Sequence, residues 1–237
     1  MDKSSMFYWW PRGRIANLKI PMPKTVLVPC TDLKNVINIF DGKDSSEFNR
    51  LVWDVEMEAS SLGYPVFVRT SHVSDKHRWR RTCYIEGVGE VRSHLHELLD
   101  FGFSVDVPFD GYVVREFLLL PWGFHAFDGM PIASERRLFF RDDELLCHHP
   151  YWPEKAIKNP DREDWRWVLK GLQKTPPNEI SLLEGYAKRI VKAVGGGFWS
   201  VDFCRHHNRR WFITDMAEGS QSWHWPKCSH APKGEKG

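Results

Sequence analysis

The stretch between Ser45 and Thr70 constrains the fold most, because a helical hydrophobic period is followed at once by a strand pattern. From Ser45 to Gly63 the apolar residues recur at helical spacing, with serine available as an N-cap and glycine as a helix stop. Val66–Thr70 is rich in β-branched and aromatic residues, which favours a strand. A chain that alternates in this way must pack helices against a sheet.

Other segments repeat this mixture of helical and extended patterns. Two more helices are predicted, one from Val91 to about Gly102 and one with Ser181 and Glu184 as a capping box. Strand patterns occur at Tyr112–Leu120, Glu135–Phe140, Glu144–His148, Phe198–Arg205 and Arg210–Asp215, and the last four form two hairpins. We therefore expect an α+β fold with mostly antiparallel strands and helices on one side of each sheet.

Length and charge limit the classes of function that fit this chain. Its 237 residues allow one large domain or two small ones that share a cleft. With 33 Lys and Arg against 31 Asp and Glu, the net charge of +2 gives no strong signal for nucleic-acid or lipid binding. The longest apolar run, Phe117–Trp122, is too short for a membrane span, and the N-terminus has no apolar core of signal-peptide length. We therefore expect a cytoplasmic protein.

The cysteines do not indicate a disulfide framework or a standard metal site. The chain has five, widely spaced and without a CxxC pair. Cys204, His206 and His207, followed by Cys228 and His230, could be written as zinc ligands. However, their spacing matches no standard zinc finger, and ligands two residues apart are expected to chelate awkwardly. We therefore expect reduced thiols and no structural zinc.

Two aspartates on the last predicted hairpin indicate a metal site. A turn at His206–Arg209 would place Asp202 opposite Ile213, so that Asp202 and Asp215 share one face as diagonal neighbours, roughly 7–8 Å apart. Mg²⁺ suits such a pair, because it takes a few carboxylate oxygens and completes its shell with water and phosphate. Glu218 could reach the same ion. Taken alone, the pair would be read as two unrelated acids on a solvated face.

Basic and hydroxylic residues elsewhere suggest phosphate binding. Arg69 ends a predicted strand beside a loop in which Ser71, Ser74 and Lys76 offer hydroxyls and an ammonium group. The loop has no glycine, so it is neither a Walker loop nor a Rossmann turn. By itself it would be read as an exposed basic turn. Arg137 shares a predicted strand face with an acid, which alone would be a cross-strand ion pair.

In chain order, these pieces resemble an ATP-grasp fold. The matching segments are Pro21–Thr25, Tyr64–Ser71, Val113–Leu118, Glu135-x-Arg137-x-Phe139, Val201–Phe203 and Trp211–Glu218. The E-x-R-x-F strand is similar to that of the translation-initiation-factor assembly chaperone of this superfamily. The resemblance implies two α+β subdomains with mostly antiparallel sheets that enclose a nucleotide cleft. We expect one domain over residues 1–225, divided into about 20–110 and 111–225, and a tail over 226–237.

The resemblance also implies a set of site residues. Arg69 would hold α- and β-phosphate oxygens, Lys76 would cover the β- and γ-phosphates, and Arg137 would stabilise the transferring phosphoryl group. The residues implied in nucleotide binding are Arg69, Ser71, Ser74, Arg115, Glu116, Phe117 and Leu118. The implied Mg²⁺ ligands are Asp202, Asp215 and Glu218, and the family's third ligand position is occupied here by Ala217.

These residues imply an ATP- and Mg²⁺-dependent enzyme, a carboxylate–amine ligase that acts through an acylphosphate. Its partners would be ATP, an unknown carboxylate and an unknown nucleophile, and the acceptor class includes proteins and peptides. Two alternatives stay open. The chain could bind Mg-ATP and clamp a protein partner without turnover. It could also be a non-enzymatic binding domain that uses its 12 tryptophans to stack on sugars or single strands.

Overall fold

Helix α3 (Ser46–Leu62) begins and ends where the sequence predicts. The Ser45 hydroxyl accepts a hydrogen bond from Phe48 N at 2.9 Å, and Gly63 follows the last turn with φ +87°. The computed structural model describes residues 2–231, and in it the chain forms two compact units. Unit 1 comprises residues 1–22, 119–127 and 131–237, and unit 2 comprises residues 23–118 and 128–130.

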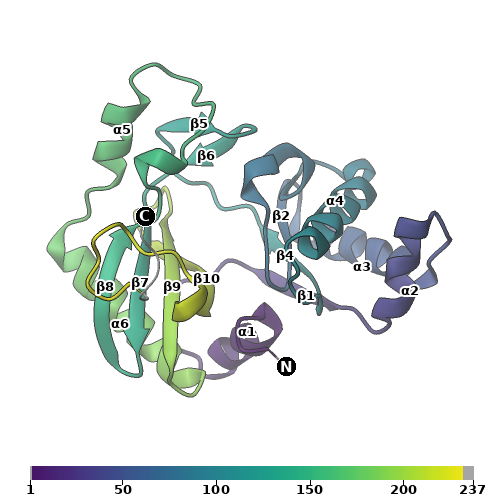
Figure 1. Ribbon diagram of the computed structural model, residues 1–237, viewed down its shortest axis with the longest axis horizontal. Helices are drawn as coiled ribbons and strands as arrows, with labels where there is room; N and C mark the ends of the chain where they lie inside the picture. Colours follow the sequence, from purple (N-terminus) through teal and green to yellow (C-terminus); the bar gives the residue numbers. More distant parts are fainter. Residues whose placement is uncertain (1, 232–237) are drawn as a thin grey trace. The chain divides into compact units, whose positions relative to one another are not determined.

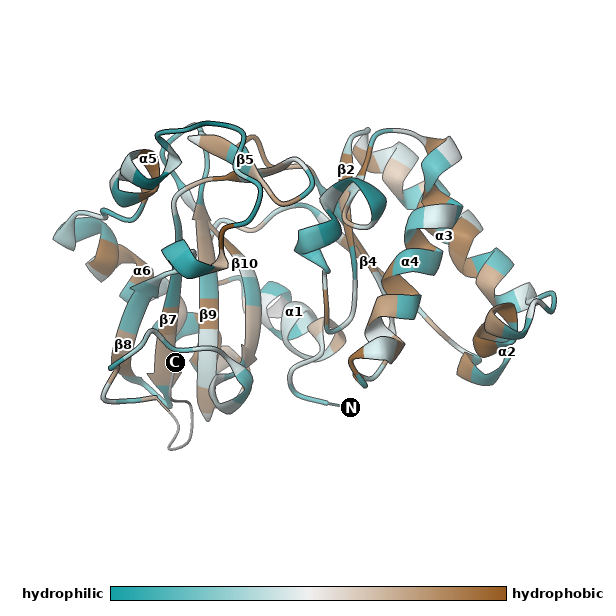
Figure 2. Ribbon diagram, turned by 45° about the horizontal axis from the view of Figure 1, so that its top comes forward, coloured by the Kyte–Doolittle hydropathy of each residue, from teal (hydrophilic) through white to brown (hydrophobic). Residues whose placement is uncertain are grey.

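Unit 2 contains a four-stranded antiparallel sheet with helices on one face. The strand order is β1 (Thr25–Pro29), β4 (Gly111–Glu116), β2 (Val66–Thr70) and β3 (Tyr84–Ile85). Its helices are α2 (Leu33–Ile37), α3 and α4 (Val91–Ser104). In Figure 2, α3 and α4 each carry hydrophobic and hydrophilic bands, as amphipathic helices do. Because β4 pairs with β1 and β2, this unit extends to Leu118 and not to the predicted boundary near residue 110.

The two faces of this sheet differ. Val66, Val68 and Val114 lie in one buried cluster with apolar residues of α3 and α4. Since side chains alternate along a strand, the other face receives Phe67 and Arg69 of β2 and their β4 partners, Arg115 and Val113. The face opposite the helices therefore carries two arginines.

Unit 1 contains the second four-stranded antiparallel sheet (Figure 1). The strand order is β10 (Trp211–Glu218), β9 (Phe198–Arg205), β7 (Glu135–Arg141) and β8 (Glu144–Pro150). Helix α6 (Pro177–Ala193) covers one face, where the ring of Tyr186 lies 6.3 Å from that of Phe203. The opposite face receives the neighbours of Phe203 in β9, including Asp202.

Shorter elements complete the described chain. They are α1 (Met6–Ile15), α5 (Trp165–Leu172), a two-stranded sheet of β5 (Phe124–Ala126) and β6 (Met130–Ile132), and the 3-10 helices η1 (Asn38–Asp41), η2 (Lys76–Arg81), η3 (Val88–Glu90), η4 (Glu154–Ala156) and η5 (Gly219–Gln221). None of the helices within residues 2–231 is long and apolar enough to cross a membrane.

Two sequence predictions about local structure are wrong. Helix α6 begins at Pro177, so Ser181 lies inside it and donates to Pro177 O at 3.2 Å instead of forming a capping box. The predicted tail is also ordered in part, because Cys228 N donates to Trp225 O at 3.1 Å and the segment up to residue 231 is described. Residues 232–237 of that tail lie outside the described residues.

Candidate functional site

Asp202 and Asp215 are direct partners across β9 and β10. The predicted register is wrong, because Ile213 pairs with Phe203 and a bulge at Thr214 then brings Asp215 opposite Asp202. Directly opposite residues share a sheet face, with Cβ atoms about 4.5–5.5 Å apart in general. The two carboxylates are therefore closer neighbours than the diagonal arrangement predicted.

Arg137 extends this row of charges to β7. It is the strand partner of Asp202, and its guanidinium donates from Nε and Nη2 to the two Asp202 carboxylate oxygens, each at 2.8 Å. The guanidinium also lies 4.8 Å from the ring centroid of Tyr151. Burial alone would lower the pKa of Arg137, but the charge and hydrogen bonds of Asp202 hold it above its ordinary value. The pair is thus a buried ion pair of two fully charged groups.

The third predicted metal ligand is less well placed than the two aspartates. Glu218 is the strand partner of Trp199, a register position on the other face of the sheet, whereas Ala217 shares the face of Asp215. Among residues 2–231, these acids do not form a group of three metal-ligating side chains. Two carboxylates still fit Mg²⁺, because that ion is commonly held by one or two carboxylates together with phosphate and water.

Unit 2 contributes a cationic face. Arg69 is only 3% exposed, and Arg115 only 4%. Arg69 Nε donates to Thr70 O at 3.1 Å, and Nη2 donates to His72 O at 2.8 Å. These bonds fix the guanidinium against its own loop, so its position is preorganised for an anion.

The loop after Arg69 is held by its own side chains. The Ser71 hydroxyl is fully buried, accepts a hydrogen bond from Asp110 N at 2.9 Å, and lies 2.8 Å from His72 Nδ1. The Ser74 carbonyl oxygen contacts Cys83 Sγ. Lys76 begins η2. Roles of Ser71, Ser74 and Lys76 toward phosphate therefore stay predictions.

The predicted adenine hinge follows β4. Glu116 N donates to Lys24 O at 3.0 Å, and Glu116 Oε1 accepts from Lys24 N at 2.7 Å. Phe117 and Leu118 come after the last residue of the strand. The Phe117 ring lies 5.1 Å from that of Tyr84, which stacks on Trp79 at 5.7 Å. Sequence reasoning missed this aromatic cluster, although Trp79 stands out within a basic segment.

A second group of side chains was also missed. We call it the cysteine–histidine cluster, and it consists of Cys147, His149, His224 and Cys228. Its ligand atoms all lie within 4.8 Å of one another. The zinc set considered from the sequence contained Cys228 but neither strand residue, and paired Cys228 with Cys204 of β9. That candidate set is therefore wrong in its members.

Comparison with known proteins places this geometry in a family. The model of an ATP-grasp domain family, family 3 of its clade, matches residues 58–231. No curated protein matches the chain significantly. Among solved structures, C-terminally truncated Cdc123 from Schizosaccharomyces pombe is similar, with a TM-score of 0.54, 12% identity, and coverage of 91% of this chain and 83% of that one.

Two further similar structures are larger. D-alanine–D-alanine ligase from Bacillus anthracis, complexed with ATP, has a TM-score of 0.50, 11% identity, and coverage of 92% of this chain and 55% of that one. An ATP-grasp RimK domain protein from Sphaerobacter thermophilus has a TM-score of 0.48, 12% identity, and coverage of 91% and 59%. The chain thus spans between half and two thirds of these two proteins. The predicted α+β ATP-grasp fold is confirmed, and the chain belongs to this ATP-grasp domain family.

Proposed function

We propose that the chain is a Mg-ATP-dependent ligase that joins a carboxylate to an amine through an acylphosphate. The observation that carries this proposal is the row formed by Asp215, Asp202 and Arg137 on one face of the unit 1 sheet. Two facing carboxylates repel each other unless cations lie beside them. Arg137 supplies one cation, and a Mg²⁺ ion between the aspartates would supply the second.

The row suits phosphoryl transfer to a carboxylate. A substrate carboxylate oxygen would attack the γ-phosphorus of ATP, the bond to the β–γ bridging oxygen would break, and ADP would leave. An amine would then attack the acyl carbon, lose a proton, and release inorganic phosphate. When bound, Mg²⁺ neutralises phosphate charge, and Asp202 and Asp215 would hold it. Arg137 would stabilise negative charge on the transferring group.

The residues of unit 2 would bind the nucleotide. Arg69 and Arg115 share one sheet face and are buried, which suits charge-assisted bonds to phosphate oxygens. The backbone of Glu116, Phe117 and Leu118 would contact adenine, with Ser71, Ser74 and Lys76 closer to the phosphates. These roles follow from family membership together with the position of each residue.

Trapping the activated carboxylate tests this proposal without knowledge of the amine. The chain is incubated with Mg-ATP, a panel of carboxylic acids and peptides, and hydroxylamine, and acyl hydroxamates are sought by mass spectrometry. A carboxylate labelled with ¹⁸O should transfer one labelled oxygen to phosphate. Asp215→Asn should abolish both products, whereas Asp143→Asn, an exposed turn acid, should not. Hydroxamate formed equally by wild type and Asp215→Asn would contradict the proposal.

A second candidate function is binding of Mg-ATP to clamp a protein partner without turnover. The bidentate contact of Arg137 with both Asp202 oxygens favours it, because an acid already paired in this way is a poorer metal ligand. This candidate predicts that Mg-ATP raises the melting temperature of the chain while no carboxylate in the panel yields ADP. The ligase proposal predicts both effects.

A further inference from the structure

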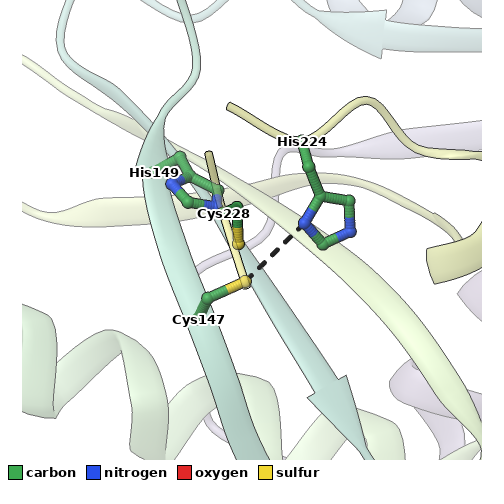
Figure 3. A group of neighbouring side chains, drawn as sticks. All are labelled: Cys147, His149, His224 and Cys228. Carbon is green, nitrogen blue, oxygen red and sulfur yellow. Dashed lines mark hydrogen bonds between the residues drawn. The ribbon is translucent and has the colours of Figure 1, made fainter. Parts of the chain in front are cut away.

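We propose that the cysteine–histidine cluster binds one structural zinc ion, which fastens the segment after η5 to the sheet of unit 1. The cluster lies outside the charge row and has no part in the proposed ligase reaction, so this inference is independent of that function. Figure 3 shows the four side chains pointing toward one another from two separate parts of the chain. Two sulfurs and two imidazoles are the ligand set of many structural zinc sites.

Strand geometry presents the first two ligands. Cys147 and His149 are two residues apart on β8, and alternation places both on one face of the sheet. His148, between them, is exposed. A spacing of two residues is awkward in a loop or helix, but in a strand it sets two ligands side by side.

The other two ligands come from the irregular segment after η5. His224 is 3% exposed, and its Nδ1 lies 3.8 Å from Cys147 Sγ. Tetrahedral zinc with ordinary bond lengths separates neighbouring ligand atoms by about 3.3–3.8 Å. The observed 3.8 Å, and the upper limit of 4.8 Å for all pairs, need only a small contraction to fit. All four positions are filled by protein, which is typical of structural and not catalytic zinc.

Neighbouring contacts hold the ligands in place. The His224 ring stacks on Phe139 of β7 with centroids 3.6 Å apart. Trp225 Nε1 donates to Pro150 O at 2.7 Å, and its ring is nearly parallel to that of His149. Support of this kind orients metal-binding imidazoles.

One polar atom in the cluster calls for a partner. His149 Nε2 is buried and has no hydrogen-bond partner among the described residues. A buried polar atom without a partner costs roughly 1–3 kcal/mol in general. Coordination through Nε2 would remove that cost, whereas a disulfide between the two cysteines would leave it.

The site also has a defined place relative to the charge row. His149 is the β8 partner of Arg137, so the cluster and the Arg137–Asp202 pair share a sheet face. On the same face, the Ser222 hydroxyl lies 2.6 Å from that of Ser200 in β9. The segment from Ser222 to Cys228 thus crosses the face from β9 to β8, and zinc would fix its far end.

Elemental analysis of the full chain, purified without a histidine tag, tests the proposal. Wild type should carry about one zinc per chain, and Cys147→Ser and His224→Ala should each retain less than roughly one tenth of that. The matched controls are His148→Ala, on the exposed side of the same strand, and Cys30→Ser, a half-buried cysteine of unit 2. Both controls should keep the full zinc content.

Cobalt substitution keeps the test informative if a variant folds poorly. Wild type loaded with Co²⁺ should develop intense thiolate-to-cobalt charge-transfer bands, and chelation should lower its melting temperature to that of Cys147→Ser. Three results would overturn the proposal: wild type that holds no zinc even after dialysis against Zn²⁺, full zinc in Cys147→Ser, or a Cys147–Cys228 disulfide in wild type found by mass spectrometry.

Discussion

The two four-stranded sheets are built alike but carry opposite chemistry on the face away from their helices. In unit 2 that face carries Arg69 and Arg115. In unit 1 it carries Asp202 and Asp215, with Arg137 as the partner of one of them. The first face suits phosphate oxygens, and the second suits a cation and the atoms that react near it. Similar backbones can therefore divide the work of Mg-ATP binding through a few residues at alternating positions.

The largest expected effect comes from the acid in the middle of the unit 1 row. Asp202→Ala should lower the free energy of unfolding by about 3–5 kcal/mol, because it leaves the buried Arg137 guanidinium without its charge partner. Asp215→Ala should cost much less. Urea unfolding of both variants measures the difference, and equal losses would show that the row is not organised around the Arg137–Asp202 pair.

The cationic face of unit 2 should respond in binding and less in stability. Arg69→Ala should weaken ATP binding by about 10–100-fold, as expected for a lost charge-assisted hydrogen bond, while adenosine binding changes little. Calorimetric titration with both ligands measures this. Arg92→Ala, on helix α4 at the other side of the sheet, is the matched control and should leave both affinities unchanged. An equal loss for ATP and adenosine would place Arg69 away from the phosphates.

The smallest effect concerns acid sensitivity on the helical side of unit 2. Hydrogen bonds from Arg50, together with those from Thr31, lower the pKa of Glu47 to about 2 despite its burial. Its folded pKa lies below the unfolded value, so this stabilisation is full above about pH 4.5 and is lost as the pH falls toward 2. Because Arg50 is partly exposed, Glu47→Gln should cost only about 1–2 kcal/mol at pH 7.

Unfolding experiments across pH check this prediction. The difference between wild type and Glu47→Gln should shrink steadily from pH 5 to pH 3. Glu58→Gln, in the same helix, should show no such trend. A difference that is constant with pH would mean that Glu47 stabilises the helix by shape and not by charge.

Periodic patterns predicted much of the fold. Helix α3 with its Ser45 cap and the hairpin that carries both aspartates follow from local hydrophobic spacing. The register of that hairpin does not, because the bulge at Thr214 adds a residue that alternation cannot reveal. Helix α1 was missed for a similar reason, since Pro11 lies inside it and proline normally argues against a helix interior.

The cysteine–histidine cluster shows what sequence spacing cannot supply. Its strand pair, Cys147 and His149, is readable only once β8 is known to be a strand. His224 and Cys228 lie in a segment without regular structure, and tertiary packing alone brings them to β8. Ion pairing in the charge row is likewise tertiary, because Arg137 and Asp202 meet through strand pairing across a long stretch of chain.

The Mg²⁺ dependence of ATP binding tests the central claim most directly. ATP affinity is measured by calorimetry for wild type and Asp215→Asn, with Mg²⁺ and with chelator. The account predicts that Mg²⁺ tightens binding to wild type by at least about tenfold, and that Asp215→Asn binds ATP equally weakly with and without the ion. The unliganded variant should melt within a few degrees of wild type, because it keeps the shape of the pair and removes a repulsive charge. Wild type and Asp215→Asn with the same Mg²⁺ dependence would contradict the assignment of the two aspartates as the metal site.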